Sequence, residues 1–188
     1  MFFDELDVFL DGFRKRYFVR SEEKPPKMDE DIIDELLDLY LLAYYEGSKD
    51  AGKELMMDIE PSVEDADRVI NKPIADKTFR ERVTAYLNGE MGETTGTPAE
   101  AIARVAETDS VRIYNEAKLD TARTLGASIK TWHTMGDDKV RDLHEVLDGV
   151  TAPIDGYFYT YTGDRAMQPG GFEDPEGNVN CRCFITVN

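Results

Sequence analysis

The sequence predicts an α+β protein, in which a helical N-terminal region and a long central helix pack on a small mixed or antiparallel β-sheet near the C-terminus. Apolar residues recur at three- and four-residue steps through the first two thirds of the chain, as in amphipathic helices. After Gly126 they alternate, as in strands. We therefore expect a helical region over residues 1–96 and a second region over 97–188.

Two helices are expected first, over residues 2–19 and 29–57. The second has a wide apolar face that must be buried, either against later helices or against another chain. Gly47 and Gly52 weaken its second half and could break it in two. The residues leave open whether the chain forms a homo-oligomer.

Shorter helices are expected over residues 61–71, with Ser62 as N-cap, and over 75–87. The Gly-rich loop 88–97 is the best candidate for a mobile hinge. The stretch 21–27, which contains two prolines, is expected to be a turn or linker. The long central helix follows over residues 97–125.

The central helix has the clearest boundaries in the chain. Thr97, Pro98 and Glu100 form a capping-box sequence with proline at the first helical position, and Gly126 stands where a left-handed cap belongs. Polar residues stand a turn apart along this helix, namely Asp109, Arg112, Asn115 and Glu116. They are either a solvated face or a buried cluster that docks the helix on the C-terminal region.

The C-terminal region should contain the sheet. Strands are expected over residues 129–134, 157–161 and 183–187. A helix capped by Asp137 or Asp138 is expected over 137–147. Trp132 is most simply a core anchor.

The charge balance excludes one class of partner. The net charge is −17, with 39 acidic and 22 basic residues, whereas sequence-independent nucleic-acid binding depends on Lys and Arg. Direct DNA binding is therefore not expected. No segment is apolar enough to span a membrane, and Asp4 and Glu5 replace the basic start of a signal peptide, so we expect the protein to stay in the cytoplasm.

The histidines and cysteines suggest a zinc site. All four lie within the last third of the chain, at His133, His144, Cys181 and Cys183. The spacing argues against zinc, because a Cys-x-Cys on a strand lacks the bend that closes around a metal. We expect no cofactor and expect the cysteines to be small core residues beneath the last strand, and a zinc-stabilised interaction domain is the weaker alternative.

An enzyme is the second hypothesis: a small hydrolase or transferase. His144 would act with Cys181 or with a nearby aspartate. In the cysteine version Cys181 is the nucleophile and His144 its base, with Asp138 or Asp142 orienting the histidine. No oxyanion loop or strained elbow supports this. The spread of aspartates over 137–148 also does not indicate a calcium site.

The order of the C-terminal residues resembles a known family signature. Lys130-Thr131-Trp132, Asp138 to His144, Leu147-Asp148-Gly149, Pro169-Gly170 and Asn180-Cys181-Arg182-Cys183 follow one another as in the phage Mu F-like minor head proteins, also called phage head morphogenesis proteins. The resemblance covers residues 97–188 and includes the helix around Thr108-Asp109 and Asn115. Lys139 and Asp109 stand where arginine and glutamate are usual.

The resemblance implies a non-enzymatic structural protein of the phage or prophage virion head, associated with the portal and/or the major capsid protein during assembly in the host cytoplasm. Related domains precede toxin domains in some phage-encoded proteins, and the five residues after Cys183 leave no room for one here. The signature would then be structural, and its members are Lys130, Trp132, Asp138, Arg141, His144, Gly149, Asn180, Cys181 and Cys183.

Overall fold

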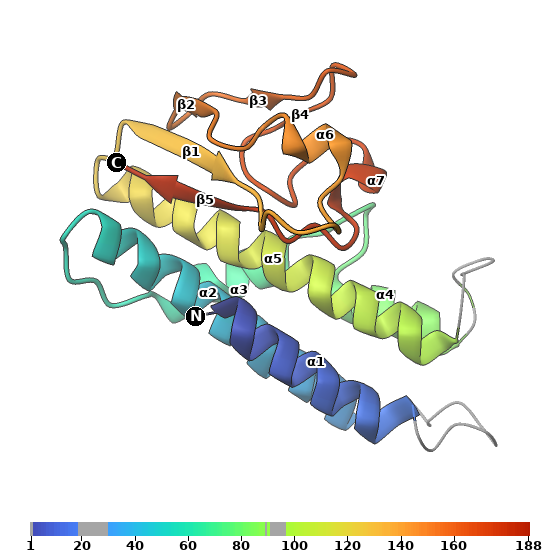
Figure 1. Ribbon diagram of the computed structural model, residues 1–188. Coiled ribbons are helices and arrows are strands. Elements are labelled where there is room, and N and C mark those ends of the chain that lie inside the picture. Colours follow the sequence, from blue (N-terminus) through green and yellow to red (C-terminus); the bar gives the residue numbers. More distant parts are fainter. Residues whose placement is uncertain (1, 19–29, 89, 91–96) are drawn as a thin grey trace.

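The long helix α5 (Pro98–Thr124) lies at the centre of the molecule, with helices on one side and a small sheet on the other (Figure 1). The computed structural model describes residues 2–18, 30–88, 90 and 97–188. The expected linker at 21–27 and most of the Gly-rich loop 88–97 lie outside the described residues. This arrangement confirms the α+β class and the antiparallel form of the sheet.

Local capping explains where α5 begins. The Thr97 side chain accepts a hydrogen bond from the Glu100 amide at 3.3 Å, and the Glu100 carboxylate accepts one from the Thr97 amide at 2.6 Å. At the other end, Gly126 has a φ of 83°, the left-handed conformation that glycine adopts without strain. Both predicted boundaries are confirmed.

The helices α1 (Phe2–Phe18) and α2 (Glu30–Glu54) bury their apolar faces on each other and on α5. The expected break in α2 is wrong, since the helix is continuous. Gly47 allows close approach instead, because a Cβ there would lie 2.1 Å from the Tyr114 carbonyl oxygen of α5. No described helix has the length and hydropathy of a membrane span.

Two short helices, α3 (Val63–Ile70) and α4 (Phe79–Leu87), cover another side of α5. Ser62 caps α3 as predicted, accepting from the Asp65 amide at 3.2 Å. The expected start of α4 at residue 75 is wrong. Ala75 and Asp76 have positive φ values of 50° and 60°, and Thr78 caps the helix in a second capping box.

The sheet consists of β2 (Thr151–Pro153), β1 (Ile129–His133) and β5 (Phe184–Val187), in that spatial order. Trp132 pairs with Ile185 across β1 and β5. The prediction that residues 157–161 supply the third strand is wrong. Within them, β3 (Phe158–Tyr159) pairs with β4 (Arg165–Ala166) in a separate two-stranded sheet.

The predicted helix over 137–147 shrinks to one turn, α6 (Asp142–Glu145), preceded by Arg141 at the N-cap position. Asp137 does not cap it. Its carboxylate accepts from the Lys139 amide at 3.2 Å and pairs with Arg182 at 3.2 Å, which holds a turn in place of a helix start. A second one-turn helix, α7 (Pro175–Asn178), follows later.

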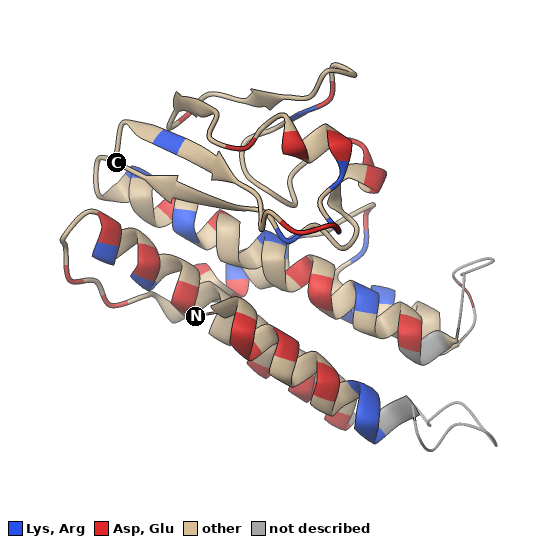
Figure 2. Cartoon of the chain, in the orientation of Figure 1, with Lys and Arg blue, Asp and Glu red and all other residues tan. Residues whose placement is uncertain are grey.

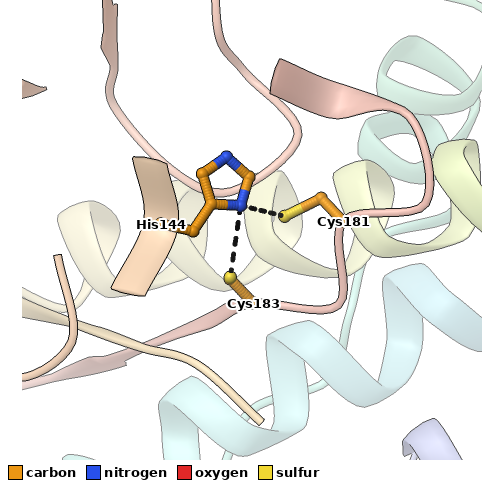
Figure 3. Close-up of side chains that lie close together, drawn as sticks. All are labelled: His144, Cys181 and Cys183. Carbon is orange, nitrogen blue, oxygen red and sulfur yellow. Dashed lines mark hydrogen bonds between the residues drawn. The ribbon is translucent and has the colours of Figure 1, made fainter. Parts of the chain in front are cut away.

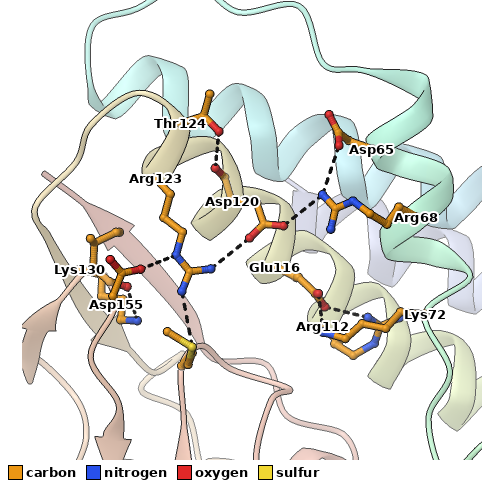
Figure 4. A network of polar contacts seen from close by, with 12 residues as sticks. Asp65, Arg68, Lys72, Arg112, Glu116, Asp120, Arg123, Thr124, Lys130 and Asp155 are labelled. Atoms are coloured by element: carbon orange, nitrogen blue, oxygen red, sulfur yellow. Dashed lines mark hydrogen bonds and ion pairs between the residues drawn. The ribbon is translucent and has the colours of Figure 1, made fainter.

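The polar residues of α5 form a buried set, as the docking hypothesis required, with exposed fractions of 0–7%. Arg112 and Glu116 pair as their spacing of one turn indicates, whereas the elements on which most of the set docks differ from the region expected. Asp109 pairs with Arg82 of α4 at 2.6 Å. Arg112 pairs with Glu116 at 3.0 Å, and Lys72 reaches Glu116 at 2.6 Å (Figure 4). Most of the set therefore docks α5 on α3 and α4, and the Asn115 side chain hydrogen-bonds to the C-terminal region.

Candidate functional site

Three chemically reactive side chains converge beneath the sheet. The Nδ1 atom of His144 lies 3.6 Å from the Cys181 sulfur and 3.7 Å from the Cys183 sulfur (Figure 3). All three residues are buried, with exposed fractions of 2–3%, and both cysteines are free thiols. Together they form the only group of three or more metal-ligand side chains within the described part of the chain.

The backbone before β5 explains how both sulfurs reach one histidine. Cys181 and Cys183 precede the strand, which begins at Phe184, so the expected strand conformation of the Cys-x-Cys is wrong. Asn180 has a φ of 53°, and the Cys181 amide donates to the Asn178 carbonyl at 3.1 Å. This bend brings both sulfurs close to His144. The straight strand expected from the sequence would lack such a bend.

Asn115 fixes the end of the bend. Its side-chain amide donates to the Cys183 carbonyl at 3.1 Å, and its side-chain oxygen accepts from the Ile185 amide at 3.0 Å. This role was not predicted from the sequence. A single asparagine among alanines and apolar residues on the buried face of α5 is the signal that could have indicated it.

Two aromatic rings pack against the histidine. The ring stacks on Phe172 with centroids 5.2 Å apart and meets Trp132 edge-on at 5.8 Å. Its Nε2 atom is buried and has no hydrogen-bond partner among the described residues. Asp138 and Asp142 are exposed and do not orient the imidazole as the enzyme hypothesis requires.

The two thiols have opposite pKa shifts. The pKa of Cys181 is lowered, because the Cys183 thiol donates to its sulfur and His144 stabilises the thiolate. The pKa of Cys183 is raised, chiefly by that same hydrogen bond, and then by burial and by the neighbouring negative charge. The two thiols therefore differ in acidity, and Cys181 is the one that more readily loses its proton.

A pocket of about 410 Å³ opens beside the three side chains, all of which contribute to its lining. Its lining includes charged side chains of both signs, among them Arg141, Arg182, Glu107 and Asp7. Burial raises the pKa of Glu107. The pocket connects the reactive side chains to a polar space large enough for several water molecules.

A larger hollow of about 820 Å³ lies along α5, away from the histidine and cysteines. Cations in its lining already have acidic partners, because Arg82 pairs with Asp109 and Lys72 with Glu116. These ion pairs leave little unneutralised charge for a ligand, so we assign the chemistry to the smaller pocket.

Three other signature residues, Gly149, Arg141 and Asn180, hold the backbone segments around the His-Cys-Cys group. Gly149 has a φ of 73° and donates from its amide to the Trp132 carbonyl at 2.8 Å. Arg141 donates to the Val179 carbonyl, and the Asn180 amide donates to the Thr108 hydroxyl at 3.2 Å. These bonds hold α6, β1 and the segment before Cys181 in position around the histidine.

Two further predicted residues lie apart from the site. His133 stacks on Phe184, with centroids 5.2 Å apart, and its Nε2 lies 2.8 Å from the Thr186 hydroxyl. Lys130 is fully buried and donates to the Ile154 carbonyl at 2.7 Å. Burial lowers the pKa of Lys130 to about 8. His133 is therefore not part of the His-Cys-Cys group.

Comparison with known protein families gives a match. The profile described as Phage Mu protein F like protein matches residues 62–186. The chain belongs to this family. The match to the phage Mu protein F-like family, a phage head morphogenesis family, confirms the resemblance and begins at α3, upstream of residue 97. No curated protein and no solved structure matches this phage Mu protein F-like chain significantly.

Proposed function

We propose that this protein is a non-enzymatic minor component of the phage or prophage virion head, and that it associates with the portal or major capsid protein during assembly in the host cytoplasm. Membership of the phage Mu protein F-like family is the observation that carries the proposal. Two buried contacts of α5 also suit a rigid assembly component. The Asp109–Arg82 ion pair fixes α5 on α4, and the hydrogen bond from Asn115 to the Cys183 carbonyl fixes α5 on the segment before β5.

An acidic surface on α1 and α2 supports the proposal that the partner is a basic protein. Acidic residues lie along α1 and α2 (Figure 2), and α2 alone carries eight acidic and two basic residues. Asp31, Asp34 and Asp38 of α2 are exposed and repeat at three- and four-residue steps. Such a row attracts Lys- and Arg-rich protein surfaces and repels DNA.

Co-assembly tests the proposal. The full chain is expressed with the portal and major capsid proteins of the same phage or prophage, and heads are isolated by sedimentation. We expect the protein to sediment with heads in few copies. Combined reversal of the α2 row should abolish this association, and the changes are Asp31→Lys, Asp34→Lys and Asp38→Lys.

A matched control separates the surface from total charge. Three exposed acids outside α1 and α2 are reversed instead, namely Asp58→Lys, Glu60→Lys and Glu64→Lys. Both triple variants change the net charge from −17 to −11, since each reversal adds two. If neither the unmodified protein nor the control variant sediments with heads, the assembly role is wrong. If both triple variants lose the association to the same extent, the α2 row is not the surface that binds the partner.

The enzyme alternative has a direct test. The Cys181 sulfur lies within reach of the His144 base, but Cys183 lies equally close to the same nitrogen, and no described residue orients the ring from Nε2. We expect Cys181 to resist low concentrations of a soluble electrophile such as iodoacetamide. Rapid, selective labelling of Cys181 would favour a hydrolase or transferase.

A further inference from the structure

We propose that His144, Cys181 and Cys183 bind one zinc ion, with a water molecule from the adjoining pocket in the fourth position. The inference rests on the placement of three side chains from α6 and from the bend before β5, and does not depend on the head-assembly role.

The distances fit a common centre. In a tetrahedral site with Zn–S of about 2.3 Å and Zn–N of about 2.0–2.1 Å, sulfur and nitrogen lie about 3.6 Å apart. The two sulfurs lie 3.6 and 3.7 Å from His144 Nδ1. All three ligand atoms lie within 4.8 Å of one another, so one ion can contact them together.

Hydrogen bonding alone explains this arrangement less well. A neutral imidazole nitrogen accepts through one lone pair, whereas two sulfurs lie at nearly the same distance from Nδ1. An ion at the centre satisfies both cysteines and the histidine at once. Zinc binding would then take the proton from each thiol that still carries one and release it to solvent, leaving two thiolates on Zn²⁺.

The donor set selects the metal. Two thiolates and one imidazole in tetrahedral geometry suit zinc better than magnesium or calcium, which prefer oxygen ligands. No fourth His, Cys, Asp or Glu joins the group within the described ranges. Since all three ligands line the 410 Å³ pocket, water can complete the coordination from that side.

Metal analysis of the full chain, purified without chelator, is the test. We expect about one equivalent of zinc per chain, falling below about a tenth in Cys181→Ser and in Cys183→Ser. His133→Ala is the matched control, because it removes the other histidine and should keep the full equivalent.

Cobalt titration of the unmodified, metal-stripped protein covers the case in which the cysteine variants fail to fold. Tetrahedral thiolate ligation gives intense visible bands and a sulfur-to-cobalt charge-transfer band, which added zinc should abolish. Zinc below about a tenth of an equivalent together with no cobalt band overturns the proposal. Stoichiometric iron or copper in place of zinc, or loss of zinc in His133→Ala, overturns it as well.

Discussion

Replacement of Gly47 by alanine should destabilise the protein, although helix propensity alone predicts the opposite. Glycine in a helix interior is about 1 kcal/mol less favourable than alanine. Here, however, the added Cβ would lie 2.1 Å from the Tyr114 carbonyl oxygen and 2.9 Å from its carbonyl carbon. Normal contact needs more than about 3.4 Å, so α2 and α5 would have to separate by about 1 Å.

The cost of that separation sets the magnitude. Forced overpacking costs about 1–3 kcal/mol or more, and a gap of about 1 Å loses up to half the dispersion energy of nearby contacts. Because α5 is held between α2 and the sheet, it has little freedom to move away. After subtraction of the propensity gain, we expect a net loss of about 2 kcal/mol, or a fall in Tm of about 4–8 °C.

Gly12→Ala is the matched control. Gly12 also lies within a helix, but a Cβ there meets only the flexible end of Arg16, at 3.3 Å. We expect this variant to gain up to about 1 kcal/mol, seen as a higher Tm in far-ultraviolet circular dichroism. If Gly47→Ala is stabilised to the same extent, the close packing of α2 on α5 is refuted.

Three further predictions concern the C-terminal region. Asn115→Ala leaves two buried backbone groups unpaired and should cost about 2–4 kcal/mol in urea denaturation; a loss below about 1 kcal/mol would contradict the docking role. Gly170→Ala combines a φ of 79° with a Cβ 2.9 Å from Arg112, so its Tm should fall, whereas an unchanged Tm would argue against this contact. Folding lowers the pKa of Lys130 from 10.5 to about 8, so the unfolded chain binds more protons between these pH values and stability rises with pH there. Lys130→Met should remove this rise, worth up to about 3 kcal/mol, and parallel pH–stability curves for the two proteins would refute the shift.

The features predicted correctly are those decided by neighbouring residues. The caps at Ser62 and Thr97 and the left-handed Gly126 depend on groups within one helical turn, and all three are present. The alternating pattern from Ile129 likewise gave β1, because one face of that strand packs in the core. The family was also predicted correctly, because the order of the C-terminal residues resembles a family signature that the profile match confirms.

The errors arise where distant residues decide the local conformation. The helix expected from residue 137 was replaced by turns because Asp137 pairs with Arg182, far along the chain. Within the strand expected at 157–161, β3 pairs with β4, and β2 is the strand that pairs with β1. Pairing partners are set by tertiary packing, which a single sequence does not encode in its local pattern.

The conformation of the Cys-x-Cys sequence is also decided by distant residues. Spacing argued against a metal only on the assumption that both residues lie on a straight strand. The left-handed Asn180 and the Asn115 bonds bend the segment before β5 begins, so the two sulfurs converge on His144. Two cysteines one residue apart can therefore approach the same histidine when a distant side chain holds the bend, and Asn115 on α5 supports the geometry on which the zinc proposal rests.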